Sequence, residues 1–295
     1  MSLSRRSLLK GLATAGAGIA GLPAAGQAKE LKRRPDDAVG LLYDATKCIG
    51  CKACMTACRE ANGLTAAERD GKWYDPQSLS GNAKNVISFY RGPKGEESFM
   101  KMQCMHCVDP ACVSVCMLGA LKKGDKGIVT YDADACVGCR YCQVACPFNV
   151  PAFEWGKATP KIVKCELCRD RLAQGKIPAC AEVCPRHAVI FGSYTELLEE
   201  AHRRLATEPK RYVPKVYGEK DGGGTQVLYL TAAGIPFEKL GLPALGEKSV
   251  PSLPETIQHT IYKGFLAPVV LYGALGAVIF RNRRKSAAGG EEGDA

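Results

Sequence analysis

Cysteine is the residue type in this chain with the clearest capacity for chemistry, because sixteen cysteines occur in 295 residues and fall into four groups. The groups have intervals of 2-2-3, 2-4-3, 2-2-3 and 2-11-3 residues, so each opens with Cys-x-x-Cys and closes with Cys-x-x-x-Cys. Thiolates at these intervals bind iron–sulfur clusters, and the first and third groups have the spacing of bacterial ferredoxins. The groups are Cys48, Cys51, Cys54 and Cys58; Cys104, Cys107, Cys112 and Cys116; Cys136, Cys139, Cys142 and Cys146; and Cys165, Cys168, Cys180 and Cys184.

Two other uses of cysteine compete with this interpretation. A zinc ribbon also pairs Cys-x-x-Cys motifs, but it needs only four ligands per site and has no use for a third closely spaced cysteine. Disulfides would suit an exported protein, but cysteines three positions apart in tight loops are poor partners for one another. The spacing therefore favours [4Fe-4S] clusters, four in all, with every cysteine assigned.

An internal repeat indicates how the groups combine. Residues 40–48 (GLLYDATKC) resemble residues 127–136 (GIVTYDADAC): a short strand, then Tyr-Asp-Ala, then the first cysteine of a group. Residues 116–121 and 184–191 each predict a strand after a closing cysteine. Groups two and three, joined by a hairpin turning at Gly124-Asp125, then form one ferredoxin-like unit, and groups one and four complete each other as a split unit around it.

In two-cluster ferredoxins the fourth cysteine of one run ligates the cluster of the other run, which predicts four ligand sets. Site 1 is Cys48, Cys51, Cys54 and Cys184, and site 2 is Cys58, Cys165, Cys168 and Cys180. Site 3 is Cys104, Cys107, Cys112 and Cys146, and site 4 is Cys116, Cys136, Cys139 and Cys142. A row of clusters passes single electrons, and the sequence contains neither a nucleotide-binding loop nor G-x-S-x-G. We therefore expect an electron conduit with no catalytic residues of its own.

Three histidines occupy positions that suggest chemistry. His106 lies between Cys104 and Cys107, where it is either a ligand or a loop residue beside a cluster sulfur. The four cysteines of that group favour the loop residue. His187 follows the last cysteine and is expected to pack or face solvent. His259 precedes an apolar segment and suits a quinone pocket, a proton path or a plain interfacial position.

The formal charge of +10 raises the question of a nucleic-acid partner. Three of these positive charges lie in the N-terminal signal, and four clusters at about −2 each would offset the rest. The remaining basic residues are interspersed with acidic ones, so we expect no nucleic-acid partner. Three of them, Lys164, Arg169 and Arg171, flank the fourth group and either raise a cluster's potential or are solvated surface charges.

The N-terminus has the features of a twin-arginine export signal. Arg5 and Arg6 precede the apolar run 12–22, a pattern typical of signals that export folded proteins. Small residues predict cleavage after Ala28, with Ala25 as the alternative. Export after folding is consistent with iron–sulfur sites, because bare cysteines would oxidise to disulfides outside the reducing cytoplasm.

A second apolar stretch lies near the C-terminus, where residues 264–280 carry no charge. At 1.5 Å per residue they span roughly 25 Å, and extension to residue 261 approaches the thickness of a bilayer core. A buried core helix is the alternative. The basic run 281–285 is typical of a cytoplasmic end, which predicts a transmembrane helix at 261–280 with everything before it outside the cytoplasm.

The expected fold class is α+β, with two nested ferredoxin-like units of short antiparallel strands and helices plus one C-terminal transmembrane helix. Within the segment after the cysteines, residues 195–205 predict an amphipathic helix and residues 217–230 a glycine-rich loop entering a strand. The expected organisation is a signal peptide at 1–28, a four-cluster domain at 29–191 with an insertion at 59–100, a periplasmic tail at 192–260, the transmembrane helix at 261–280 and a cytoplasmic tail at 281–295.

The motifs LLYDATKCIGCKAC, QCMHCVDPACVSVC, GCRYCQVACPFNVP and YGEKDGGGTQVLYLT resemble those of the four-cluster subunits of bacterial respiratory oxidoreductases. This family includes the electron-transfer subunits of formate dehydrogenase, dimethyl sulfoxide reductase and polysulfide reductase. With the twin-arginine signal, the chain also resembles, over nearly its whole length, the membrane-anchored ferredoxin-type subunits of periplasmic nickel–iron hydrogenases.

The resemblance implies a complex at the periplasmic face of the bacterial inner membrane. Its expected partners are the small and large hydrogenase subunits and an integral membrane subunit that reacts with quinone. The equivalent subunit of a formate dehydrogenase or another molybdopterin enzyme is the alternative within the same class. A zinc- or disulfide-stabilised exported scaffold is the alternative without a redox role.

Overall fold

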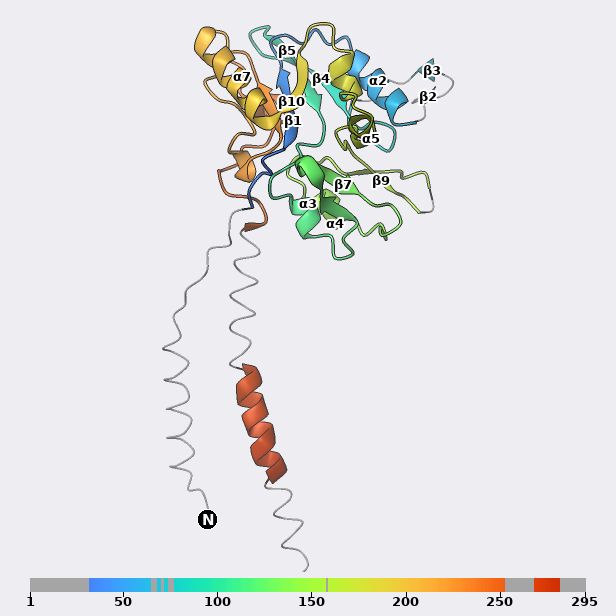
Figure 1. Cartoon of the computed structure of the whole chain (residues 1–295), viewed down its shortest axis with the longest axis vertical. Coiled ribbons are helices and arrows are strands. Elements are labelled where there is room, and N and C mark those ends of the chain that lie inside the picture. Colours follow the sequence, from blue (N-terminus) through green and yellow to red (C-terminus); the bar gives the residue numbers. More distant parts are fainter. Residues whose placement is uncertain are drawn as a thin grey trace, which may run out of the picture. The chain divides into compact units, whose positions relative to one another are not determined.

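The protein has a mixed α/β fold of short helices and strands, seen here in a computed structural model (Figure 1). The structure describes residues 32–64, 68–69, 72–73, 77–157, 159–252 and 268–281. The predicted signal peptide at 1–28, His259 and the predicted tail at 282–295 lie outside the described residues.

The principal sheet has β1 (Val39–Asp44) at its centre, between β10 (Val189–Ser193) and β11 (Val227–Leu230). β10 runs antiparallel to β1, and β11 runs parallel to it. Leu41, Leu42 and Tyr43 of β1 are all buried, as expected for a strand covered on both faces. The strand that leads into the first cysteine group therefore lies beside the strand that leaves the fourth.

α7 (Tyr194–Thr207) covers one face of this sheet, where Leu197 packs with Leu42 in a common apolar cluster. The helix begins at the N-cap Ser193, whose hydroxyl accepts a hydrogen bond from the Glu196 N–H at 3.3 Å. The Glu196 carboxylate accepts from the Ser193 N–H in return, which completes a capping box. The amphipathic helix predicted in this segment is confirmed.

A buried ion pair ties α7 to the end of β1. Arg204 Nη1 donates to Asp44 Oδ2 at 2.9 Å, and Tyr212 Oη donates to the same oxygen at 2.9 Å. Asp44 is fully buried, so its carboxylate depends on these donors in place of water. The contact joins residues 160 positions apart in the chain.

The other elements are short. Those that belong to the cysteine groups are α2 (Ala53–Ala61), α3 (Ala111–Ser114), β6 (Leu121–Lys123), η1 (Asp125–Gly127), β7 (Val129–Tyr131), α4 (Tyr141–Ala145), α5 (Arg169–Ala173) and α6 (Ala179–Glu182). The remaining ones are β2 (Glu68–Arg69), β3 (Lys72–Trp73), β4 (Val86–Arg91), β5 (Glu97–Met102), β8 (Ala152–Phe153), β9 (Ile162–Val163), η2 (Asp221–Gly223) and η3 (Phe237–Leu240).

Two similar arrangements contain the cysteine groups. In the first, which we call the inner unit, α3 packs against α4, and β6 and β7 form an antiparallel hairpin. In the second, the outer unit, α2 packs against α6, and the antiparallel β1–β10 pair replaces the hairpin. The predicted inner hairpin is confirmed, and η1 forms its turn. The predicted glycine-rich loop is also confirmed, since η2 leads through it into β11.

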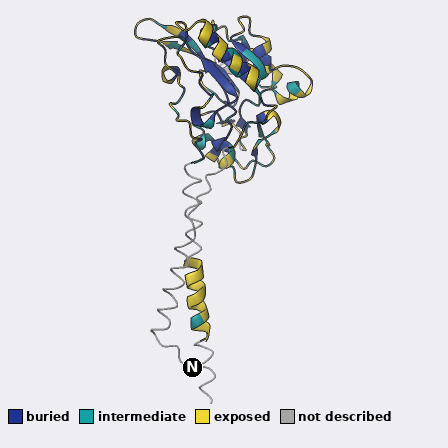
Figure 2. Ribbon diagram, turned by 60° about the vertical axis from the view of Figure 1, so that its left-hand side comes forward, coloured by how far each residue is buried: buried dark blue, intermediate teal, exposed yellow. Residues whose placement is uncertain are grey.

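Burial is concentrated in the principal sheet and around the cysteine groups (Figure 2). Residues 268–281 form a helix whose side chains are almost all exposed. Among the described residues, no helix is both long enough and apolar enough to cross a membrane. The transmembrane helix predicted at 261–280 lies partly outside the described residues and stays a prediction.

Candidate metal centres

The four cysteine groups share one backbone feature. In each Cys-x-x-Cys loop, the residue just before the second cysteine has a left-handed conformation, with φ between 49° and 71°, and these residues are Gly50, His106, Gly138 and Leu167. At Gly50 a side chain is excluded twice, because a Cβ atom would also lie 2.2 Å from the ring of Phe99. His106 and Leu167 have the same conformation, which is sterically strained for residues other than glycine.

The left-handed turn directs backbone N–H groups toward sulfur. The Gly50 N–H donates to Cys48 Sγ at 3.5 Å, and the Leu167 N–H donates to Cys165 Sγ at 3.4 Å. Such a loop is an anion-binding concavity, and hydrogen bonds to the sulfurs are one of the means by which a protein stabilises a cluster and sets its potential.

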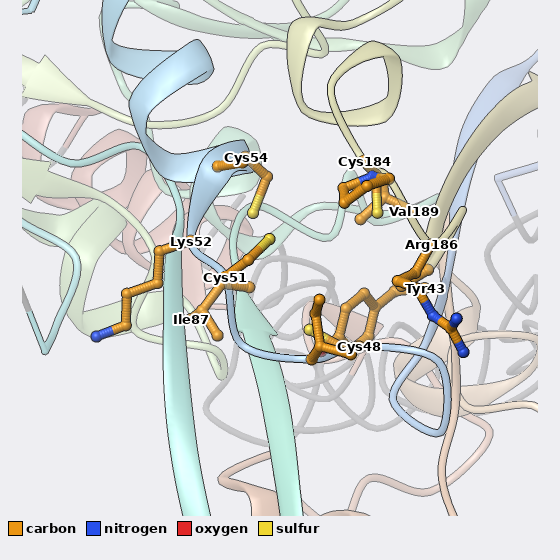
Figure 3. A pocket seen from close by; sticks show the side chains of 13 residues that line it. Tyr43, Cys48, Cys51, Lys52, Cys54, Ile87, Cys184, Arg186 and Val189 are labelled. Atoms are coloured by element: carbon orange, nitrogen blue, oxygen red, sulfur yellow. The ribbon is translucent and has the colours of Figure 1, made fainter.

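The members of sites 1, 2 and 4 line three separate cavities. All four cysteines of site 1 line one cavity, where Figure 3 shows their side chains around one space with Lys52 pointing away. All four cysteines of site 2 line a second cavity, and all four of site 4 line a third. In each case the set combines cysteines from two groups, as the predicted crossing requires.

The four cysteines of site 3 are shown to be neighbours by the electrostatic interactions of Cys107. Burial raises the pKa of this thiol well above its usual range, and Cys104, Cys146 and Cys112 raise it further. These are the other three members of the predicted set. Iron binding by the sixteen cysteines stays a prediction, but the structure brings each of the four sets together.

The chemistry of the donor sets fits [4Fe-4S] clusters. Burial raises the pKa of Cys54, Cys58 and Cys112 to about 12, so bare thiols here are protonated and metal binding would release their protons. Among the described residues, no group of three or more His, Cys, Asp or Glu side chains is close enough to hold a single metal ion. The cysteines of sites 1, 2 and 4 instead surround a space, which suits a polynuclear cluster.

Two amide side chains add donors around site 2. Lys101 Nζ donates to Gln103 Oε1, and the Gln103 Nε2 group is buried without a hydrogen-bond partner where Gln103 lines the cavity. In the same cavity, Lys84 Nζ donates to Asn62 Oδ1 at 2.8 Å, and Asn62 Nδ2 donates to Cys58 Sγ at 3.6 Å. An orphaned buried N–H beside four thiols is the donor that a cluster sulfur would satisfy.

Sequence reasoning missed Lys101 and Gln103 because they lie just beyond a segment without cysteines. Lys101 is on β5, which the sequence analysis did not associate with any cysteine group. The alternating pattern of the strand gave no signal for its burial, because the buried Ser98 and Met100 lie on the strand face opposite to Lys101.

The basic residues flanking the fourth group separate into two kinds. Lys164 is buried, and its Nζ donates to the carbonyl oxygens of Val129 and Cys165, so the interpretation of Lys164 as a solvated surface charge is wrong. Arg171 pairs with an exposed carboxylate, that of Glu182, at 2.6 Å. Arg169 is half exposed and lies 3.8 Å from Glu166, so the surface interpretation holds for both arginines.

A partly buried lysine lies in the inner unit. Lys123 Nζ donates to the Cys107 carbonyl at 2.7 Å and to Gln226 Oε1 at 2.6 Å. Burial lowers its pKa to about 8, although Cys107 and Cys104 oppose the shift. The ammonium group therefore lies next to site 3.

The histidines have structural positions. His106 is fully buried, and its Nδ1 accepts a hydrogen bond from the Val129 N–H at 3.0 Å. Burial lowers the His106 pKa well below its usual range, with Lys164 and Lys123 adding to the shift, so the ring is neutral. His187 is exposed and has φ 48°, in a turn closed by its N–H on the Cys184 carbonyl at 3.2 Å.

Site 4 differs from the others in the surface around it. Apolar side chains beside its cysteines are exposed, including Val144 at 85 % and Met117 at 81 % of their maximal areas. Cys139 is itself exposed. We call the exposed apolar residues Met117, Leu118, Val137, Tyr141 and Val144 the site 4 rim.

The comparisons with known proteins agree with this chemistry. Residues 96–194 match the family described as 4Fe-4S dicluster domain. The chain is 42 % identical to the hydrogenase-2 operon protein HybA of Escherichia coli O157:H7, over 96 % of each sequence. It is 36 % identical to the nitrate-inducible formate dehydrogenase iron-sulfur subunit of Escherichia coli K12, over 80 % of each.

These similarities define the class as iron–sulfur proteins that include subunits of formate dehydrogenases. Within that class, the chain belongs to the family of the hydrogenase-2 operon protein HybA, which it matches over almost its full length. A protein of Nitratidesulfovibrio vulgaris is 45 % identical over 73 % of this chain and 60 % of its own length.

Proposed function

We propose that this chain is the electron-transfer subunit of a nickel–iron hydrogenase complex, with four [4Fe-4S] clusters held at sites 1 to 4. Electrons would pass from the hydrogenase small subunit, through the four clusters, to an integral membrane subunit that reacts with quinone. The observation that supports this most directly is the grouping of all sixteen cysteines into four sets, three of them lining cavities.

When bound, each cluster would accept and donate one electron at a time. The residues of this chain hold it, exclude water and provide hydrogen-bond donors to sulfur. The cysteines of sites 2 and 3 are buried or partly buried and would keep their clusters away from solvent, and the left-handed loop residues would aim N–H groups at the clusters. The inner and outer units are, in this proposal, two nested ferredoxin-like units within residues 29–191, with residues 192–260 as an extension that includes α7 and β11.

Partner docking is expected where a cluster reaches the surface. The site 4 rim combines an exposed ligand, Cys139, with apolar side chains that a monomeric protein would seldom leave in water. A rim of this kind suits a partner subunit whose own redox centre must come close to site 4. We propose this face as one end of the electron path.

The proposed location is the periplasmic face of the bacterial inner membrane. The twin arginines support export of the loaded protein, and the apolar stretch with its basic run supports a C-terminal anchor at 261–280. Replacing Arg5 and Arg6 by lysine should leave cluster-containing protein in the cytoplasm. Unchanged periplasmic assembly of that variant would contradict the export route.

A second candidate is the equivalent subunit of a formate dehydrogenase, favoured by the 36 % identity to such a subunit. The two candidates differ in the catalytic partner. Affinity purification of the full chain from its own host, followed by metal analysis, distinguishes them: nickel indicates hydrogenase and molybdenum or tungsten indicates the alternative.

The test of the clusters themselves is anaerobic purification of the full-length chain. We expect roughly sixteen iron atoms per chain and a broad visible absorption that bleaches on reduction with dithionite. A colourless protein containing stoichiometric zinc, or one in which the cysteines form disulfides, would contradict the proposed function.

A further inference from the structure

Lys101 is a buried cation at the junction of the two outer sites. It lies on β5 opposite Ile87 of β4, and its side chain has no solvent exposure. Within the described chain, its side-chain hydrogen bond goes to a neutral amide, Gln103 Oε1. A buried ammonium paired with an amide still lacks a compensating negative charge, and such a charge is costly unless anions lie nearby.

The negative charge near Lys101 would come from cysteines bound to the clusters. The sulfurs that interact with it electrostatically belong to both outer sites, namely Cys54 of site 1 and Cys58, Cys165 and Cys180 of site 2. Lys101 is paired across the hairpin with Ile87, which lines the site 1 cavity, and it donates to Gln103, which lines the site 2 cavity.

A fixed positive charge favours whichever cluster state is more negative. One-electron reduction adds one negative charge to a cluster whose oxidised form, with its four thiolates, already carries about −2. Attraction to Lys101 is therefore stronger in the reduced state, and it is little screened because the site is buried. The consequence is a higher reduction potential than the same cluster would have without the lysine.

At site 2, Gln103 adds a second contribution to the reduction potential. Because Lys101 donates to Oε1, the orientation of the amide is fixed with Nε2 as the remaining donor, and Nε2 has no partner where Gln103 lines the site 2 cavity. A cluster sulfur is the acceptor that this donor lacks, and the resulting hydrogen bond would also strengthen on reduction.

We propose that Lys101 is a potential-setting residue shared by sites 1 and 2, which raises the reduction potentials of both clusters directly and, at site 2, also by orienting the Gln103 amide toward the cluster. This inference rests on the proposed function, since it requires clusters at these sites. Site 4 provides an internal reference, because neither Lys101 nor Gln103 lines its cavity.

The test is an EPR-monitored redox titration of the anaerobically purified full chain, comparing K101M with K94M. Lys94 is exposed in the β4–β5 turn, so K94M removes the same formal charge from the same hairpin without touching the junction. We expect K101M to shift two of the four components to more negative potentials. The expected size is at least a tenfold change in the oxidised-to-reduced ratio at a fixed solution potential, or about 59 mV for one electron. K94M should leave all four near the wild-type values.

A second variant covers the case in which K101M does not incorporate its clusters. Q103E preserves side-chain size, keeps Lys101 and places a carboxylate against it, so the charge is neutralised in place. We expect the same negative shift, largest at one component. Outer-site potentials unchanged relative to K94M, in whichever variant contains its full iron, would overturn the role of Lys101. A wild-type protein without iron–sulfur signals would instead overturn the proposed function.

Discussion

Site 2 and site 4 each have four cysteine ligands, but the surroundings of the two sites differ. Site 2 lies inside the outer unit, where Lys84 and Lys101 each donate to an amide side chain that lines its cavity. The ammonium group of Lys101 is fully buried, and its hydrogen-bond partner in the described part of the chain is an amide, not a carboxylate. Site 4 lies at the surface of the inner unit, where one ligand and the rim around it are exposed. The repeated loop geometry is therefore common to both sites, while charge and solvent access are not.

This difference indicates a division of roles along the row of sites. A buried cluster exchanges electrons only with neighbouring clusters in the same chain, so its surroundings are free to supply charges and donors that adjust its potential. An exposed cluster must face another protein, and an apolar rim excludes water once that protein is bound. The two sites thus lead to separate tests.

Removal of one ligand should have the largest effect, and an unequal one. C180A and C139A should each lose about four iron atoms per chain, because each removes a ligand of one proposed cluster. C180A should also lower the melting temperature strongly, since Cys180 is buried in the main apolar cluster. C139A should leave the remaining clusters and the fold intact. Equal melting temperatures for the two variants, by calorimetry, would contradict the contrast between the sites.

The outer unit also depends on the ion pair between β1 and α7. R204M keeps a long side chain but leaves the fully buried Asp44 carboxylate without its cation, which should lower the free energy of unfolding by about 3–5 kcal/mol. R203M, one residue away, removes an exposed partner of Glu200 and should change stability by less than ~1 kcal/mol. Denaturant unfolding followed by circular dichroism measures both. Similar values for the two variants would exclude a structural role for the buried pair.

The rim can be tested by placing a charge in it. V144E should weaken association with the partner complex by about tenfold, or ~1.4 kcal/mol, because a carboxylate would be desolvated at the interface. Its iron content should not change. F89E, at a similarly apolar but separate exposed position on β4, is the control and should bind normally. Co-purification at graded salt concentrations compares the two; full binding by V144E would remove the rim as a docking face.

Lys164 should give the smallest of these effects. Burial raises the pKa of Cys104 and Cys112, and Lys164 opposes that shift at both, so K164M should lower the potential of site 3. The expected change is a few-fold in the oxidised-to-reduced ratio, less than about 59 mV, because Lys123 remains beside the same site. Redox titration of K164M beside K161M, which alters a nearby lysine outside the site, provides the measurement. A shift in the site 4 component instead would contradict the assignment.

Local features of the fold were predictable from the sequence, and distant contacts were not. The cysteine intervals, the hairpin that turns near Gly124 and the capped helix after Ser193 depend on a few neighbouring residues, so they can be read directly. The split outer unit was predictable only because the repeat includes its two strands. The pairing of β11 with β1 could not be predicted in this way, because parallel pairing of residues far apart in the chain leaves no local sequence pattern.

The charges around the sites were the least predictable. Lys164 was recognised as a neighbour of a cysteine, but its burial depends on the inner hairpin to which it donates. Lys101 was not recognised, because its position near the cysteines exists only once β5 contacts the principal sheet, where the hydroxyls of Tyr43 and Tyr229 donate to the carbonyls of Phe99 and Lys101. A lysine's charge is visible in a sequence, whereas its distance from a site is set by tertiary packing.

The position of β1 in the middle of the principal sheet has a consequence for synthesis. The strand is made first, yet one of its neighbours ends at residue 193 and the other at residue 230. While the chain is being translated, residues 104–146 can already form their hairpin and helices, since the strand pairing of β6 with β7 joins residues that are close in the sequence. β1 therefore reaches its final pairing only after the ribosome has passed residue 230, and a chain that stops before residue 227 would leave β1 without its parallel neighbour.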